Sequence, residues 1–457
     1  IHREGFCKCR KDGSSKPSNC HENTSTKPPN NLTLKEELLH FIWKFKYLAD
    51  QNLETLSKES ITILHPGTEN LQDGPDFFNA RIKIGNEEWV GNVEIHVNAS
   101  DWNKHGHTPN KKYSNLILHV VYNQDVEIDV LTFQKIPTLE LKGILPKQLL
   151  VNYTELLNNS DWVPCAAKIN TVDDFQINTW LNRLLVERIE GRTLYIEQLF
   201  EKYQYDWNST FLEVLFKGFG FKQNAHAFSM LAQCIGYSIL KKEKDEGREN
   251  LEALLLGSAG FLPESSNHFY IQSLVKLFSF QKTKYSIEPI TKSEWTFGGV
   301  RPPNQPVVRI IQLVRFLYFI PFPLTDLIGE NFLKEIQSGL NHKGENYWKS
   351  HGNIETPNKS GVPKMGSSSI DGIIINSLLP FQFFYAKWTK SLSLMDNALD
   401  SFALIKAEKN GIVEKWKSLG LSAENAGRTQ ALLELKNNYC SQKKCLFCAI
   451  GNQVVKP

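Results

Sequence analysis

The sequence predicts a mixed α+β protein, in which an N-terminal α/β domain precedes a large and mostly α-helical region. Two patterns indicate this order. Between residues 61 and 133, apolar residues alternate along short segments that Gly and Asn residues separate, which is typical of strands. From about residue 151 onward, apolar residues recur at the three- and four-residue spacing of helices. A chain of 457 residues is long enough for two or three domains.

Composition divides the chain into four segments. We expect a disordered tail (residues 1–32), the α/β domain (33–150), the helical region (151–435) and a C-terminal cysteine cluster (436–457). The tail is rich in Lys, Ser, Pro and Asn and has no apolar periodicity. The net charge of +3 gives no global signature of nucleic-acid binding, but it does not exclude a local basic groove. No apolar run reaches about eighteen residues, so we expect no membrane span and a cytoplasmic protein.

The α/β domain is expected to open with a helix. Thr33 and Glu36 have the spacing of a capping box with Thr33 as the N-cap. Apolar residues from Leu38 to Leu48 follow at helical spacing. Strands are then predicted at residues 61–65, 79–84, 89–97, 116–122 and 126–133.

The second and third of these strands form a predicted hairpin. A Gly-Asn turn joins them, and a loop of two or three residues would place Asp76 opposite Ile95 or His96. Glu94 and His96 share one face of the return strand, because side chains alternate along a strand. The hairpin alone should therefore bring Asp76, Glu94 and His96 together at one end of the sheet.

The second region is expected to be built from helices. Gly-containing turns separate its apolar periodic segments. Helices are predicted at residues 175–199, 208–221, 225–240, 251–256, 271–280, 307–318, 324–337, 391–416 and 429–438, and residues 370–384 are predicted to be an apolar, buried segment.

Acids and histidines in the hairpin indicate metal-assisted hydrolysis. Polar groups on buried strands are costly unless they do chemistry or bind a metal. Asp76 and Glu94 would offer the oxygen ligands that Mg²⁺ or Mn²⁺ prefers, and such an ion polarises a phosphodiester and activates water. His96 could position that water or act as an acid or base. His105 and His107 follow in the polar connection to the next strand.

Simpler explanations stay open for several of these residues. Asp76 follows Gly-Pro and could be a turn acid. Asp101 could be a cap that orients His105. His119, inside an apolar strand, is more typical of a hydrogen-bonded core histidine. Alternatively, His105 and His107 could bind Zn²⁺ together with Asp101.

This stretch resembles known nucleases. Gly-Pro-Asp76, a hairpin and Glu94-Ile-His96 resemble the PD-(D/E)XK nuclease superfamily, with histidine where that motif has lysine. The segment from Glu94 to His107 is similar to the His-rich stretch of the very-short-patch-repair endonucleases, which belong to the same superfamily. Most of the chain after residue 33, including its Cys-Leu-x-Cys-x-Ile-Gly end, resembles a bacterial family, the domain-of-unknown-function family 2851.

The resemblance implies a restriction-endonuclease-like α/β fold over about residues 35–130. It also implies that Asp76 and Glu94 bind a metal ion and that Glu37, on the first helix, completes the site. His96 would replace the motif lysine, and because imidazole is mostly neutral at pH 7, it would stabilise charge less well.

The resemblance further implies that His105 or His107 serves as an additional acid or base. The missing positive charge could come from one of three neighbouring lysines: Lys104, Lys111 or Lys112.

Three cysteines near the C-terminus have the spacing Cys-x4-Cys-x2-Cys, namely Cys440, Cys445 and Cys448. Three thiolates at this spacing can share Zn²⁺ or an iron–sulfur cluster, with a fourth ligand from elsewhere. Three reduced structural cysteines are the alternative. The clustering favours a metal in a reducing compartment over disulfides. Cys165 and Cys234 stand alone in the sequence and are predicted to be buried small hydrophobic residues.

The expected function is divalent-metal-dependent hydrolysis of nucleic-acid phosphodiester bonds, with DNA as the expected partner. Two alternatives from other classes stay open. One is a catalytically inactive nuclease fold that binds nucleic acid or acts as a scaffold. The other is a zinc-dependent hydrolase built on His96, His105 and His107.

Overall fold

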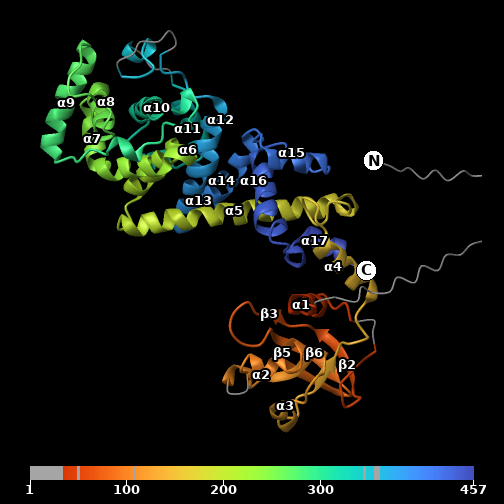
Figure 1. Cartoon of the computed structure of the whole chain (residues 1–457). Coiled ribbons are helices and arrows are strands. Elements are labelled where there is room, and N and C mark those ends of the chain that lie inside the picture. Colours follow the sequence, from red (N-terminus) through yellow and green to blue (C-terminus); the bar gives the residue numbers. More distant parts are fainter. Residues whose placement is uncertain (1–33, 49–51, 108–109, 343–345, 355–360, 457) are drawn as a thin grey trace, which may run out of the picture. The chain divides into compact units, whose positions relative to one another are not determined.

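The computed structural model describes residues 34–48, 52–107, 110–342, 346–354 and 361–456. The chain divides into two compact units, one ending at Glu155 and one spanning Leu156–Val455 (Figure 1). The first unit contains a sheet, and the second is built from helices. The predicted mixed class, a sheet region followed by a large helical region, is confirmed. The predicted tail and the predicted N-cap Thr33 lie outside the described residues.

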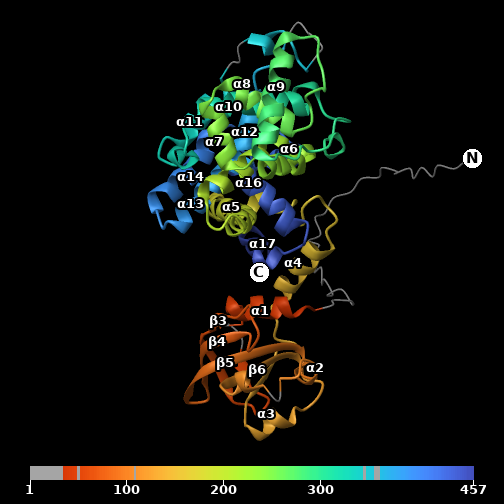
Figure 2. The same cartoon turned by 90° about the vertical axis from the view of Figure 1, so that its left-hand side faces the viewer.

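The sheet unit holds a mixed sheet with the strand order β1-β2-β4-β5-β6-β7, and β3 pairs with β4 at one side. The pairs β1–β2, β2–β4 and β4–β5 are antiparallel, whereas the pairs β5–β6 and β6–β7 are parallel. Figure 2 shows these elements from a second side. The elements in chain order are α1 (Glu36–Lys44), β1 (Leu53–Glu54), β2 (Ser60–His65), β3 (Thr68–Glu69), β4 (Phe77–Ile84), β5 (Glu87–Asn98), α2 (Asp101–Lys104), η1 (Lys111–Tyr113), β6 (Leu116–Asn123), α3 (Asp129–Phe133), β7 (Thr138–Glu140) and α4 (Lys147–Asn158).

The strands predicted at 61–65, 79–84, 89–97 and 116–122 are present, but the strand predicted at 126–133 is wrong. Residues 129–133 form helix α3 instead. Ile128 and Leu131, three residues apart, are buried in one apolar cluster, whereas Val126 and Phe133 are exposed. A three-residue spacing buries one face of a helix, and alternation along a strand cannot produce it.

Helix α1 begins at Glu36 and packs on β5. Its N-cap is Lys35, whose side chain makes no capping bond, so Glu36 stands in the first turn and not at the third helical position. An acid in that turn is favoured by the helix dipole. Leu38, Leu39 and Ile42 are fully buried, which confirms the predicted apolar stripe.

A β-bulge in β4 sets the start of the hairpin. Along most of the hairpin the strands pair in the predicted register, with Ala80 opposite Gly91. Phe77, however, pairs with Val93, one residue out of that register, and between these pairs Asn79 adopts a φ of 54°. Asn tolerates this left-handed conformation better than most residues do. The bulge therefore moves the first residues of the hairpin by one position along β5.

The helical unit is organised along α5, with α13 and α16 packed beside it (Figure 1). No helix among the described residues is long and apolar enough to cross a membrane. The elements are η2 (Ile169–Thr171), α5 (Asp174–Lys202), α6 (Trp207–Ile235), α7 (Tyr237–Asp245), α8 (Arg248–Ser258), α9 (Phe269–Tyr285), η3 (Lys292–Glu294), η4 (Pro302–Asn304), α10 (Pro306–Phe319), η5 (Leu324–Leu327), α11 (Phe332–Leu340), η6 (Asn346–Lys349), α12 (Ser367–Ile373), the π-helical η7 (Ile374–Leu378), α13 (Leu379–Trp388), α14 (Leu392–Leu404), α15 (Gly411–Ser418), α16 (Ala426–Glu434), the π-helical η8 (Leu435–Cys440), η9 (Cys445–Phe447) and α17 (Ala449–Val455).

Several predicted helices are divided in the structure. The segment 225–240 breaks at Gly236, which has a φ of 70°. The segment 391–416 forms two helices, because the Asn410 side chain accepts hydrogen bonds from two backbone N–H groups and caps α15. The segment 324–337 becomes the short helix η5 followed by α11.

The bulge predicts a backbone-specific effect at Asn79. Its side chain is exposed, so Asn79→Val changes little packing but places a β-branched residue at positive φ, which costs about 1–2 kcal/mol. We expect a lower unfolding temperature of the sheet unit and faster amide hydrogen exchange in β4 and β5. The matched control is Lys83→Val, at an exposed position of the same strand in regular register. Equal destabilisation by both variants would show that the bulge does not constrain the hairpin.

Candidate metal and catalytic site

The carboxylates of Asp76 and Glu94 meet at one end of the hairpin. The Asp76 backbone N–H donates to Glu94 Oε2 at 3.1 Å, and the Ile95 backbone N–H donates to Asp76 Oδ2 at 2.8 Å. Each carboxylate is therefore held by the backbone of the facing segment. Glu94 is only 3% exposed. The structure thus brings together the two acids that the hairpin register predicted to meet.

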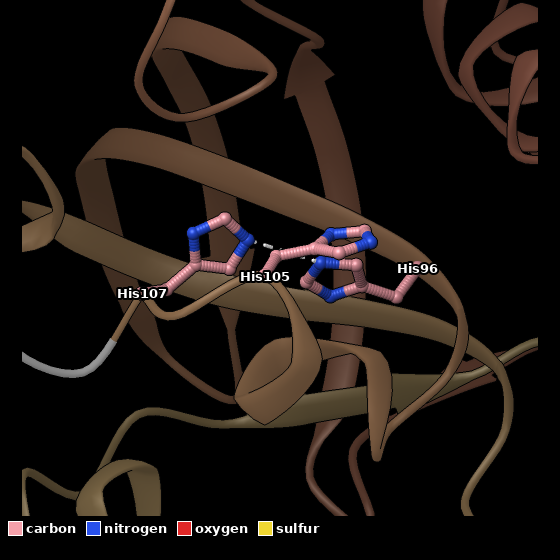
Figure 3. Close-up of side chains that lie close together, drawn as sticks. All are labelled: His96, His105 and His107. Carbon is pink, nitrogen blue, oxygen red and sulfur yellow. Dashed lines mark hydrogen bonds between the residues drawn. The ribbon is translucent and has the colours of Figure 1, made fainter.

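Three imidazoles gather beside Glu94, those of His96, His105 and His107 (Figure 3). One ring nitrogen of each lies within 4.8 Å of the other two. His107 Nε2 is 3.3 Å from His96 Nε2 and 3.1 Å from Glu94 Oε1. His96 is buried, His107 is half-buried and His105 is exposed, so the group opens toward solvent on the His105 side. Three imidazoles at this spacing are a donor set for Zn²⁺ or a similar ion.

His119 positions His96 from behind. It pairs with Glu94 in the parallel β5–β6 ladder, and its Nε2 lies 2.9 Å from His96 Nδ1. A partner at one ring nitrogen sets the tautomer and orientation of an imidazole, which leaves His96 Nε2 directed at His107 and Glu94. His119 is fully buried, as expected of a core histidine, but it also contacts the site.

Helix α1 contributes an acid and a histidine that the sequence analysis missed. Glu36 and His40 are one turn apart and share a face of the helix. His40 Nε2 lies 3.3 Å from Asp76 Oδ2, and the charge of Asp76 acts on Glu36. Glu37, the helix acid expected from the resemblance, is exposed. The structure therefore places Glu36, and not Glu37, beside Asp76, and the four-residue spacing of Glu36 and His40 is the signal that could have identified them.

Burial shifts this site toward its neutral forms. Burial, and next the charge of Asp76, raises the pKa of Glu94 to about 9. Burial, and next His119, lowers the pKa of His96 to about 2, and burial lowers the pKa of His119 to about 4. Burial also lowers the pKa of His107. Without a metal, Glu94 is therefore protonated and these imidazoles are neutral at pH 7, and a divalent cation would restore the carboxylate by supplying the missing positive charge.

Of the two α1 groups, only His40 shifts toward its charged form. Burial, and next the charge of Asp76, raises the pKa of Glu36. Burial alone would lower the pKa of His40, but the neighbouring Asp76 carboxylate outweighs it, so the pKa of His40 is raised. An ion pair between His40 and Asp76 is therefore the cationic contact that this end of the site already has.

Asp101 and the neighbouring lysines have structural partners. Asp101 Oδ2 accepts the Asn98 backbone N–H at 2.9 Å, and its Oδ1 lies 2.6 Å from Lys104 Nζ. Asp101 is thus a turn residue, and the imidazole group does not include it. Lys112 pairs with Asp73, an acid at the surface. Lys104 therefore pairs with the half-buried Asp101, and Lys112 pairs with the exposed Asp73.

The predicted cysteines lie in the helical unit. Cys440 ends the π-helical segment η8, Cys445 begins η9 and Cys448 immediately precedes α17. All three are free thiols, and so is Cys165. These cysteines belong to the helical unit, whereas the acids and histidines belong to the sheet unit.

The buried Glu94 predicts a pH-dependent stability of the metal-free protein. Its pKa of about 9 in the folded state exceeds the value of about 4.3 in an unfolded chain, so its contribution to stability is complete below pH 4 and is lost as the pH rises toward 9. Glu94→Gln removes this loss. With EDTA present, the variant should gain stability over the wild type from pH 5 to pH 8, by at most about 1.4 kcal/mol per pH unit.

Urea unfolding at several pH values measures this difference. The control is Glu88→Gln, which changes an exposed acid of the same strand that pairs with Arg81. A Glu94→Gln difference that stays constant with pH would mean that Glu94 is ionised throughout this range.

Comparison with known protein families identifies the family of this chain. A family model described as a protein of unknown function (DUF2851) matches residues 36–411. No curated protein and no solved structure matches the chain. The match includes the acids, the histidines and most of the helical unit. Because it covers most of the sequence, the chain belongs to the DUF2851 family.

Proposed function

We propose that the sheet unit is a divalent-metal-dependent hydrolase of nucleic-acid phosphodiester bonds, with a restriction-endonuclease-like α/β core. The observation that carries this proposal is the pairing of the Asp76 and Glu94 carboxylates through reciprocal backbone bonds at one strand end. Two acids held this way, with imidazoles beside them, suit a site for Mg²⁺ or Mn²⁺. The partner would be nucleic acid, with DNA as the first substrate to test.

The residues present fit a divalent ion. Glu94 is buried beside a second carboxylate, and its ion-pair contacts in the described chain are to His96 and His107. Burial lowers the pKa of both histidines, so they provide little positive charge at neutral pH. Asp76 and Glu94 would hold the ion, which would polarise the phosphodiester and lower the pKa of a bound water.

His96 has a positioning role in this proposal. Its ring is 1% exposed and is fixed between His119 on one side and His107 on the other. A neutral imidazole does not supply the charge that a motif lysine would. His96 would therefore orient its neighbours, while the charge at the phosphate would come from the ion.

His107 and His105 are the groups that can exchange protons with a substrate. The side chain of His107 is 12% exposed and its Nε2 lies 3.1 Å from Glu94 Oε1. His105 is exposed at the open side of the imidazole group. An imidazole within hydrogen-bond reach of the reacting atoms can act as an acid or base. His107 is the better placed of the two, because it also contacts the carboxylate.

A cleavage assay tests the proposal. Plasmid, linear duplex, single-stranded DNA and RNA would be incubated with the purified chain and Mg²⁺ or Mn²⁺. Asp76→Asn and Glu94→Gln should each lower the cleavage rate by at least about a hundredfold, because each removes a charged oxygen ligand. Glu88→Gln is the matched control, and it should keep the wild-type rate.

Two results would count against a nuclease. Cleavage that survives Asp76→Asn would come from another protein in the preparation. Salt-sensitive binding of nucleic acid by the wild type, without turnover under any metal, would instead favour an inactive nucleic-acid-binding module.

The imidazole group favours a second candidate, a zinc-dependent hydrolase. His96, His105 and His107 offer three nitrogens within 4.8 Å of one another, and three protein ligands plus water are typical of catalytic zinc. Glu94 would then act beside the metal, because its Oε1 lies 3.1 Å from His107 Nε2 and 3.5 Å from His96 Nε2. Such a carboxyl group could take the proton of the activated water.

Metal and variant dependence separates the two candidates. If zinc is the catalytic ion, hydrolysis should require Zn²⁺, and His105→Ala should abolish it together with about one bound zinc per chain, because one of three ligands is lost. Asp76→Asn should then cost much less than His105→Ala. Activity with Mg²⁺ that falls with Asp76→Asn and tolerates His105→Ala would exclude the zinc candidate.

A further inference from the structure

Four cysteines meet in the helical unit, although one of them is far from the others in sequence. Cys165 lies in the turn before α5, and the remaining three, Cys440, Cys445 and Cys448, lie near the C-terminus. Each thiol is close enough to the other three for their charges to interact. Cys165, Cys445 and Cys448 are less than 9% exposed. Cys165 is therefore not an isolated core residue, as the sequence suggested, but the fourth member of this cluster.

Two lysines bring the Cys165 segment to the C-terminal cysteines. Lys436 Nζ donates to the Trp162 carbonyl at 2.7 Å. Lys443 Nζ donates to the Leu157 and Asn159 carbonyls. Both lysines lie in or beside the Cys-x4-Cys-x2-Cys segment, so the two parts of the chain are joined on both sides of the cluster.

The turn around Cys448 is built for a close approach of backbones. A Cβ on Gly451 would lie 2.2 Å from the Cys445 carbonyl oxygen, so no other residue fits there without a shift. The backbone N–H groups of Ile450 and Gly451 point at the Cys448 sulfur and favour its thiolate. The π-helical segment that leads into Cys440 adds a second irregular feature, of a kind that is frequent at functional sites.

Trp180 on α5 supplies an unpaired donor at the same place. Its side chain is 6% exposed, and its indole Nε1 has no regular hydrogen-bond acceptor. That nitrogen nevertheless lies close enough to the Cys448 sulfur to favour the thiolate. A buried N–H without an acceptor is costly. A sulfur ligand with full negative charge would provide the acceptor that a protonated thiol does not.

The spacing of the cysteines along the chain distinguishes between two kinds of metal centre. Structural zinc sites are typically built from two pairs of ligands that are close together in sequence. Here three cysteines have the spacing Cys-x4-Cys-x2-Cys and the fourth is far away in sequence. The spacing Cys-x4-Cys-x2-Cys together with a distant fourth cysteine is typical of plant-type iron–sulfur proteins. Iron–sulfur clusters are held by four cysteine thiolates, each bound to an iron atom of a multinuclear core.

We propose that Cys165, Cys440, Cys445 and Cys448 hold an iron–sulfur cluster in the helical unit. The cluster would fasten the C-terminal turn to the segment before α5, and the Trp180 and backbone N–H groups would stabilise its sulfur ligands. Burial raises the pKa of Cys165 to about 12 and that of Cys445 to about 11 when no metal neutralises them. Iron binding would displace those protons, as metal binding to buried thiols does.

Iron and sulfide analysis tests this proposal. The full chain would be purified without oxygen and reconstituted with ferrous iron, sulfide and dithiothreitol. We expect at least two iron and two sulfide per chain, a brown colour with visible absorbance, and less than one zinc. Cys165→Ser and Cys448→Ser should each lower the iron content at least twofold. Cys234→Ser, at a half-buried cysteine outside the cluster, should keep it.

Three outcomes would overturn the proposal. Less than one iron per chain after reconstitution would exclude a cluster, and one tightly bound zinc with four sulfur neighbours would replace it with a zinc site. Iron retained in Cys165→Ser as in Cys234→Ser would remove Cys165 from the ligand set. Cys165→Ala, whose smaller apolar side chain suits the buried position, serves as a second variant if the serine variant fails to fold. The electron paramagnetic resonance of the reduced wild-type protein gives a readout that needs no variant.

Discussion

The burial of Glu94 between Asp76 and three imidazoles is the constraint on which the sheet unit depends. A carboxyl group that is 3% exposed beside a second acid cannot stay ionised without positive charge, and burial and Asp76 together raise its pKa to about 9. The surrounding histidines do not relieve this, because burial lowers the pKa of His96 and His107. The arrangement is therefore costly unless a cation completes it, which is why a metal-dependent reaction is the function that this geometry supports best.

Glu94 lies between two groups of side chains that can bind a metal, the Asp76 carboxylate on one side and the imidazoles on the other. For this reason the site suits two kinds of metal-dependent hydrolase. Its Oε2 accepts the Asp76 backbone N–H, while its Oε1 faces His107 and His96. The oxygen-rich side suits a hard ion such as Mg²⁺, and the nitrogen-rich side suits Zn²⁺. In the helical unit, burial, and next the neighbouring cysteines, raises the pKa of Cys165 and Cys440, so a metal ion that neutralised these thiols would be favoured in the same way.

Local pattern predicted the hairpin well, since alternation and a Gly-Asn turn are properties of neighbouring residues. The predicted hairpin register also placed Asp76 near Glu94. The bulge at Asn79 changes that register by one residue at this end of the hairpin. For α1, the resemblance implied Glu37 as the acid of the site, and the sequence alone does not show which face of the helix is directed toward the sheet. In the structure, His40 contacts Asp76, and Glu36 is close enough for the charge of Asp76 to act on it. Both positions depend on how α1 packs against β5.

The sequence by itself determined the order of sheet and helices, the strands around the acids and the three clustered cysteines, because each of these follows from spacing along the chain. Only the tertiary structure decided which distant residues join them. His119 reaches His96 through a parallel strand pairing, and Cys165 reaches Cys440 through contacts between segments more than two hundred residues apart. Such contacts leave no periodic signal in one sequence, since they are set by packing and by hydrogen bonds to backbone carbonyls that any residue could offer.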